Sequence, residues 1–139
     1  MSMNTISKRT RNAVYDTHLH LVFVVKYRKE VLTGEMLSSL EGYFRELCSS
    51  AGAELEEFNG EMDHVHLLVS LPPRLAVATL VNSLKGVSSR YLRRDYPELL
   101  DEQLWGKHLW SRSYYVGTAG GAPLDSLKQY IQNQDRPKV

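Results

Sequence analysis

The sequence predicts an α+β fold of the ferredoxin-like or RRM-like class, with the element order βαββαβ and one antiparallel sheet. Two long segments repeat apolar residues at the spacing of a helix, and four shorter segments are rich in β-branched and aromatic residues. These segments alternate in the order that this fold requires. The chain has 139 residues, of which 42% are hydrophobic, and no linker divides it, so residues 1–139 are expected to form a single domain.

The first half of the chain supplies three of the strands and one helix. Residues 17–27 read as a central strand, because apolar and aromatic residues follow one another almost without interruption. Residues 34–51 keep their apolar side chains at helical spacing. A weaker strand at 53–58 leads through a turn to a strand at 62–71, which two prolines end.

The second half predicts a helix at 75–94 and a fourth strand at 110–118. Gly120-Gly121 then forms a flexible joint before an additional short helix at 123–135. In the ferredoxin-like arrangement the first and third strands are central neighbours, and both main helices cover one face of the sheet. The opposite face must be covered by the last helix, by a partner or by a ligand.

Composition excludes several classes of protein. No run of apolar residues reaches the roughly 18 that a membrane helix needs, so no membrane partner is expected. Residues 1–12 are polar and basic, unlike a secretory signal. Cys48 is the only cysteine, cannot form an internal disulfide, and falls on the apolar side of an expected helix. These features favour a cytoplasmic location.

Charge is segregated along the chain although the net charge is only +1. Residues 1–30 and 64–100 are rich in lysine and arginine, whereas residues 31–63 are mostly acidic. Such a distribution can present one basic face. Ordinary solvated surface is the alternative interpretation.

The motif His64-Val65-His66 is the most informative feature of the sequence. Side chains alternate between the two faces of a strand, so His64 and His66 are expected to point the same way and could grip one metal ion. A lone His-x-His motif is more often structural than a ligand pair. His18 and His20 lie in the strand expected beside it, where a structural role is favoured over one that orients the metal ligands.

The last expected helix carries a second constellation. Tyr130 and Gln134 are four residues apart, so they lie on one face of that helix. Gln134 could supply an oxygen as third ligand, and Tyr130 could attack a phosphodiester held by the metal. Taken alone, Tyr130 is better explained as an ordinary residue at the edge of an amphipathic helix.

Together these motifs resemble the small single-tyrosine HUH transposases of bacterial insertion sequences, which move DNA as single strands. The resemblance covers nearly the whole chain. It rests on the first-strand pattern His20–Arg28, the motif Asp63–Leu68, Ser83–Gly86, Leu109–Tyr114, and Tyr130 followed by Gln134. The family often has proline just before the aspartate of the histidine motif, where this chain has Met62; the change alters a turn and no ligand.

The resemblance implies a mechanism. By it, His64, His66 and Gln134 bind Mg2+ or Mn2+, and Tyr130 forms a 5′-phosphotyrosine with the DNA. The substrate would be single-stranded DNA that carries imperfect hairpins at the element ends. The protein would act as a homodimer in which each mobile tyrosine helix, residues 123–135, can complete the site of the other subunit.

Basic and aromatic residues are candidates for DNA contacts, through phosphates for the cations and base stacking for the tyrosine. They are Arg11, Lys26, Tyr27, Arg28, Lys85, Arg90 and Arg93. Two alternatives remain open: a HUH replication or conjugation nickase, and a non-catalytic ferredoxin-like module that binds single-stranded nucleic acid. The short chain disfavours a nickase, and a binding module would place aromatic residues rather than histidines on its central strands.

Overall fold

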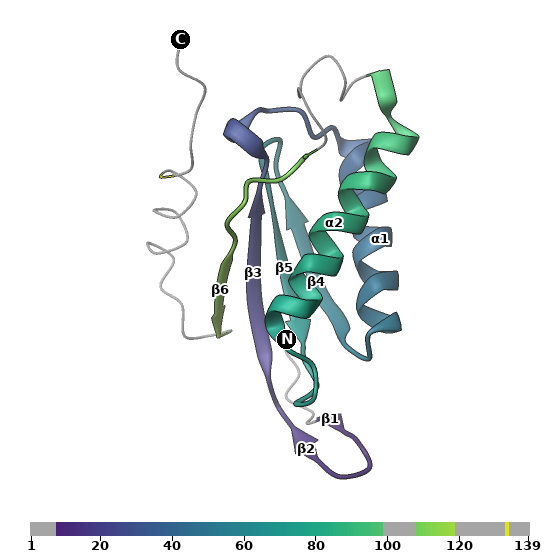
Figure 1. Ribbon diagram of the computed structural model, residues 1–139, viewed down its shortest axis with the longest axis vertical. Helices are drawn as coiled ribbons and strands as arrows, with labels where there is room; N and C mark the ends of the chain where they lie inside the picture. The colour runs from purple at the N-terminus through teal and green to yellow at the C-terminus, as the bar shows by residue number, and fades with distance from the viewer. Residues whose placement is uncertain (1–7, 99–107, 119–132, 134–139) are drawn as a thin grey trace.

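The computed structural model describes residues 8–98, 108–118 and 133. The described elements are arranged as one four-stranded antiparallel sheet, two helices and a small separate hairpin (Figure 1). The sheet has the strand order β4-β5-β3-β6. Its strands are β3 (His18–Val24), β4 (Glu54–Gly60), β5 (His64–Ser70) and β6 (Tyr115–Thr118), and its helices are α1 (Gly34–Ser50) and α2 (Val77–Asp95).

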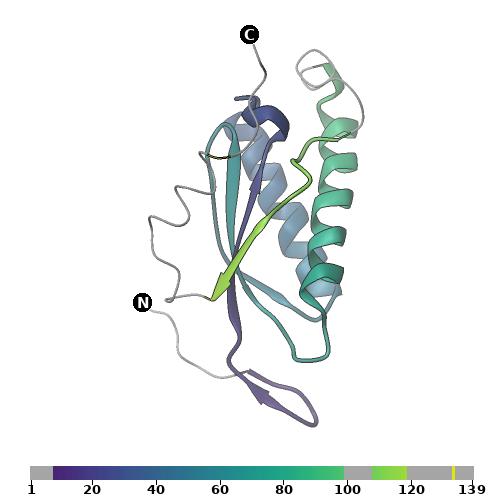
Figure 2. The same cartoon turned by 60° about the vertical axis from the view of Figure 1, so that its left-hand side comes forward.

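The predicted fold class is confirmed. The chain order β3-α1-β4-β5-α2-β6 is the βαββαβ order, and β3 and β5 are the two central strands. Both helices lie on the same side of the sheet, as the turned view makes clear (Figure 2). The additional helix expected at 123–135 lies outside the described residues apart from Asn133, and it stays a prediction.

Pairing of β3 with β5 divides the side chains of both strands between two faces. The register sets Val22 opposite His66 and Val24 opposite His64. On the side of the helices, alternate residues of both strands form the main core: Leu19, Leu21, Phe23, Val65, Leu67 and Val69. The other side, here called the histidine face, carries the remaining residues: His18, His20, Val22, Val24, His64, His66, Leu68 and Ser70.

Helix α1 begins where its sequence supplies a cap. The Thr33 hydroxyl accepts a hydrogen bond from the backbone N–H of Met36 at 3.2 Å. The helix ends at a turn in which Gly52 has φ +84°, a left-handed conformation that suits glycine. Its inward face includes Cys48, which is buried as expected, and burial raises the pKa of this thiol to about 11.

Three local features differ from the sequence prediction. A small hairpin, β1 (Lys8–Arg9) with β2 (Val14–Tyr15), was not expected. The first main strand ends at Val24, because the chain turns into a short 3-10 segment, η1 (Lys26–Arg28). The strand expected at 110–118 begins only at Tyr115.

Trp110 explains why the last strand starts late. Its backbone forms only an isolated bridge with Val25, and its side chain is buried against Phe23 with ring centroids 5.8 Å apart. The indole N–H donates to the Ser88 hydroxyl of α2 at 3.0 Å, and the backbone N–H of Leu109 donates to Ser89. Residues 109–110 therefore dock on α2, and Trp110 packs in the core.

Strand β4 contains a bulge. Its register with β5 shifts between Leu55, which lies opposite Val69, and Glu57, which lies opposite Leu68. Glu56 is thus an extra residue in an edge strand of the sheet, without a partner in the ladder.

Neither helix of the described segments has the length and apolar character needed to cross a membrane.

The contact between Trp110 and Ser88 generates a test of the core. Ser88→Ala would leave the buried indole N–H without an acceptor, so we expect a loss of about 1–3 kcal/mol in the free energy of unfolding, measured by urea denaturation. Ser83→Ala makes the same chemical change at an exposed position of α2 and should stay within roughly 0.5 kcal/mol of the unmodified protein. Equal effects of the two substitutions would contradict this assignment.

Candidate active site

Three histidine rings gather on the histidine face. The ring centroids of His64 and His66 are 4.9 Å apart, and those of His20 and His66 are 5.6 Å apart. His64 and His66 come from β5 and His20 from the neighbouring β3, where it lies opposite Leu68. The expected orientation of His64 and His66 toward one side of the sheet is confirmed.

Burial favours the neutral form of two of these rings, His20 and His66. Desolvation, together with the smaller effects of the neighbouring His64 and His20, lowers the pKa of His66 to about 4. Desolvation also lowers the pKa of His20. An imidazole must be unprotonated to bind a metal through a ring nitrogen, so His66 is in the required form at neutral pH. The chemistry of the His64 and His66 donors therefore fits a divalent ion.

Asp63 fixes the orientation of His64. The Asp63 Oδ1 atom lies 2.7 Å from Nδ1 of His64, and both side chains are largely buried. A carboxylate on one ring nitrogen leaves the other, Nε2, for a metal, which is a common arrangement around metal-binding histidines. This role of Asp63 was not predicted from the sequence. The sequence feature that could have indicated it is a carboxylate directly before His64, the first histidine of the pair.

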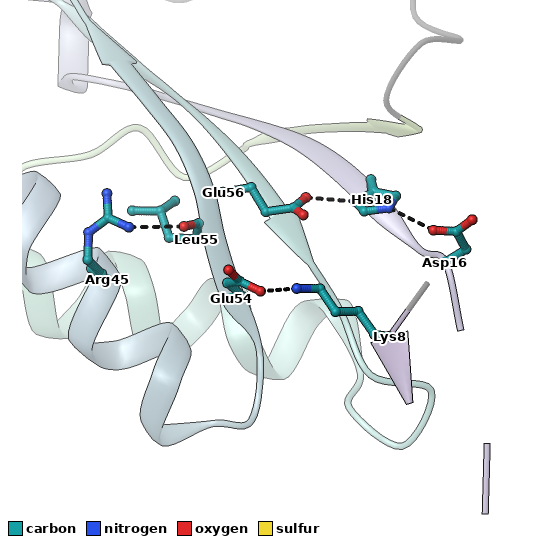
Figure 3. Close-up of polar contacts among 7 residues, drawn as sticks. All are labelled: Lys8, Asp16, His18, Arg45, Glu54, Leu55 and Glu56. Atoms are coloured by element: carbon teal, nitrogen blue, oxygen red, sulfur yellow. Dashed lines mark hydrogen bonds and ion pairs between the residues drawn. The ribbon is translucent and has the colours of Figure 1, made fainter. Parts of the chain in front are cut away.

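His18 belongs to a different polar cluster, near the start of β3. Its Nδ1 lies 2.6 Å from Glu56 and its Nε2 lies 3.0 Å from Asp16 (Figure 3). These two hydrogen bonds raise the pKa of His18 above its ordinary value. Nearby, Lys8 of the small hairpin pairs with Glu54 of β4 (Figure 3). Because acidic partners occupy both of its ring nitrogens, His18 has the structural role that the sequence analysis favoured.

The described residues supply two of the three predicted metal ligands, His64 and His66. Across residues 8–98 and 108–118, no group of three or more His, Cys, Asp or Glu side chains is arranged to hold a metal ion. Tyr130 and Gln134, the predicted nucleophile and third ligand, lie outside the described residues. Their roles stay predictions.

The candidate DNA contacts differ in exposure. Arg11, in the turn of the small hairpin, and Arg90, on α2, are exposed. The Tyr27 side chain is 43% exposed, and the Lys26 ammonium lies 5.5 Å from the centroid of its ring. Arg93 is half-buried on α2. The DNA contacts of these five residues stay predictions.

Lys85 and Arg28 have partners within the protein. The Lys85 ammonium donates to the backbone carbonyls of Ser111, Arg112 and Ser113 at 2.6–3.1 Å. Its three hydrogen-bonding protons are thus matched by three acceptors, and it ties α2 to the segment before β6. Arg28 is paired with Asp63.

Comparison with known proteins places the chain in a class. The family model described as "Transposase IS200 like" matches residues 13–134, which is most of the chain. This chain therefore belongs to the IS200-like family of single-tyrosine transposases, which are DNA strand transferases. Membership disfavours both alternatives, the replication or conjugation nickase and the non-catalytic binding module.

Two curated relatives support this placement. The chain is 38% identical over 127 residues to the ISDra2 transposase TnpA of Deinococcus radiodurans, covering 91% of this chain and 90% of that protein. It is 31% identical over 115 residues to the transposase for insertion sequence element IS200 of Salmonella typhimurium, covering 83% of this chain and 74% of that protein.

Solved structures agree with the fold. A crystal structure of a candidate transposase from Deinococcus radiodurans superposes with a TM-score of 0.85 at 34% identity, covering 94% of this chain and 99% of that one. A REP-associated tyrosine transposase bound to a REP hairpin superposes with a TM-score of 0.55 at 10% identity, covering 91% of this chain and 68% of that one. The second match concerns the fold alone.

Titration of His66 tests the buried cluster. In the metal-free protein we expect the ring resonance of His66, followed by NMR, to titrate near pH 4. An unfolded chain takes up this proton near its ordinary pKa of about 6.5, so His66 lowers the stability of the fold as pH falls from 6.5 toward 4. His18 is an internal reference because its pKa is raised. A His66 midpoint close to the ordinary value would contradict the proposed desolvation.

Proposed function

We propose that the protein cleaves and rejoins single-stranded DNA at hairpin-bearing ends of an insertion sequence, through a 5′-phosphotyrosine intermediate. Tyr130 is the nucleophile, and His64, His66 and Gln134 are the ligands of Mg2+ or Mn2+. One observation carries the proposal. His64 and His66 share one face of a central strand with their rings 4.9 Å apart, and Asp63 leaves Nε2 of His64 available for a ligand.

The reaction balances without an external cofactor that is consumed. The Tyr130 phenol oxygen attacks the phosphorus of one phosphodiester and loses its proton to solvent or to a nearby base. The bond from phosphorus to the 3′ oxygen breaks, and that oxygen takes up a proton. Because the phosphotyrosine keeps the energy of a phosphodiester, a 3′ hydroxyl of another DNA end can attack it and restore free Tyr130.

A divalent ion, when bound, would neutralise charge on the phosphate as the tyrosine attacks. The protein prepares for it by keeping His66 unprotonated and by directing His64 through Asp63. Gln134 would complete a set of three protein ligands, which leaves positions for a phosphate oxygen and water.

The DNA would be bound by residues on several parts of the surface. Arg11, Lys26 and Arg90 are candidates for phosphate contacts, and Tyr27 is placed with enough exposure to stack on an unpaired base. A hairpin substrate is part of the same proposal and follows from the resemblance to the single-tyrosine transposases. We also propose a homodimer in which Tyr130 of one subunit completes the site of the other.

The nucleophile can be tested directly. Labelled single-stranded hairpin DNA from candidate element ends, incubated with Mg2+ or Mn2+, should give a covalent protein–DNA adduct that denaturing gels resolve. Tyr130→Phe should remove the adduct, because it deletes only the attacking oxygen. Tyr91→Phe makes the same change on α2 and should leave the adduct in place. An adduct that survives Tyr130→Phe would show that another residue attacks.

The same adduct assay tests the proposed metal ligand His64. His64→Ala should abolish metal-dependent cleavage while most hairpin binding, measured by gel shift, is retained. Loss of both would mean that His64 is needed for the fold and not for the metal.

Mixing two inactive variants tests the placement of the tyrosine. In a heterodimer of Tyr130→Phe with His64→Ala, a site assembled in trans combines the intact histidines of one subunit with the intact tyrosine of the other. We therefore expect the co-expressed mixture to recover adduct formation that neither variant has alone. If each site uses its own tyrosine, every site in the mixture stays defective and no adduct returns.

A further inference from the structure

Arg28 is placed behind the metal ligand pair and not on the surface. Its Nε atom lies 3.6 Å from Oδ2 of Asp63, while Oδ1 of the same carboxylate contacts His64. The side chains are only 13% exposed for Arg28, 15% for Asp63 and 8% for His64. The three side chains therefore form a continuous, mostly desolvated row that ends at the imidazole.

The backbone at Arg28 adopts a costly conformation. Tyr27 has φ +61° and Arg28 has φ +55°, so two consecutive residues with side chains lie in the left-handed region. Such backbone conformations are unfavourable for residues with side chains and persist only where surrounding contacts impose them.

Backbone hydrogen bonds tie this turn to the histidine motif. The N–H of Val25 donates to the carbonyl of Asp63 at 2.8 Å, and the N–H of Leu32 donates to the carbonyl of Met62 at 3.0 Å. The segment between Val25 and Leu32, which includes Arg28, is thus held at both ends against the residues that precede His64.

We propose that Arg28 is a positioning residue that acts through Asp63 on His64. It holds the Asp63 carboxylate in the orientation that accepts the Nδ1 proton of His64, and so keeps the lone pair on Nε2, where a metal would bind. The proposal rests on the function proposed for His64, but its central claim concerns the metal-free protein.

The chemistry of the groups gives the direction of the effect. An ionised carboxylate can only accept hydrogen bonds, so the proton between Asp63 and a neutral His64 belongs to Nδ1. Without Arg28, a buried carboxylate would lose a charge that compensates it, and it would be free to turn away from the ring. The proton of a neutral imidazole could then occupy Nε2 and block the position that a metal requires.

This role differs from a contact between Arg28 and a DNA phosphate. A phosphate contact predicts weaker hairpin binding and a smaller salt dependence when Arg28 is replaced, with His64 unaffected. A positioning role predicts a changed His64 ring in the absence of both DNA and metal.

The test is nitrogen NMR of the imidazole rings in the full-length, metal-free protein at pH about 8, above the ordinary imidazole pKa of roughly 6.5. In the unmodified protein, His64 should carry its proton on Nδ1. Arg28→Gln should move a measurable share of it to Nε2, and Arg28→Lys, which keeps the charge, should restore part of the original state. Arg45→Gln is the control, since it removes an arginine paired with Glu41 on α1, away from the histidines.

Titration with Mn2+, followed by electron paramagnetic resonance without DNA, supplies a second readout. Loss of an outer contact of this kind typically weakens metal binding about 10-fold to 100-fold, and we expect Arg28→Gln near the lower value. Near-UV circular dichroism checks that the variants are folded. If Arg28→Gln does not fold, Arg28→Met, which also removes the charge and keeps a long side chain, takes its place in the comparison.

The outcomes separate the two proposals. An unchanged His64 tautomer in a folded Arg28→Gln variant overturns the positioning role, whatever happens to hairpin binding. A changed tautomer supports it. Failure of the unmodified protein to bind Mn2+ would count against the proposed metal site, while a tautomer that still depends on Arg28 would leave the positioning role standing.

Discussion

The pairing of β3 with β5 is the constraint on which the rest of the structure depends. These two central strands are in register over seven residues each, and their alternation sends one set of side chains under the helices and the other to the histidine face. The core and the candidate site are therefore two sides of the same ladder. Shifting the register by one residue would exchange the faces and bring the histidines into the core.

The side chains of the candidate site are polar and largely buried, so each must offset a free-energy cost of desolvation. His20 and His66 meet the cost of desolvation by staying neutral. Asp63 and Arg28 offset this cost by forming an ion pair with each other. The histidine face thus combines the neutral imidazoles of His20 and His66 with a charge pair at the residue that precedes β5.

The elements of the fold could be predicted from sequence because periodicity and β-branched runs reflect burial directly. The paired histidines followed from alternation along one strand, and their nearness to His20 followed from the expected strand order. The roles of Lys85 and Arg28 could not be predicted in this way, because a basic side chain has the same sequence signal whether it meets a phosphate or a backbone carbonyl. Lys85 meets three carbonyls and Arg28 meets Asp63.

Boundaries were harder to predict than elements. Residues 110–114 resemble a strand in composition, but Trp110 is anchored to α2 by a hydrogen bond between side chains that lie 22 residues apart in the chain. The hairpin of β1 and β2 lacks an apolar alternation that would identify it. Tyr130 and Gln134 were predicted from spacing and family resemblance, and both lie outside the described residues.

The bulge at Glu56 has a consequence for how molecules of this protein behave in a crowded solution. β4 is an edge strand, and a straight edge strand is a template on which other chains can add and aggregate. The extra residue interrupts its ladder, Glu57 adds a negative charge, and Glu54 and Glu56 bind Lys8 and His18. This side of the sheet is thereby protected from strand addition, an advantage for a protein that exposes unpaired strands whenever it is synthesised and folds.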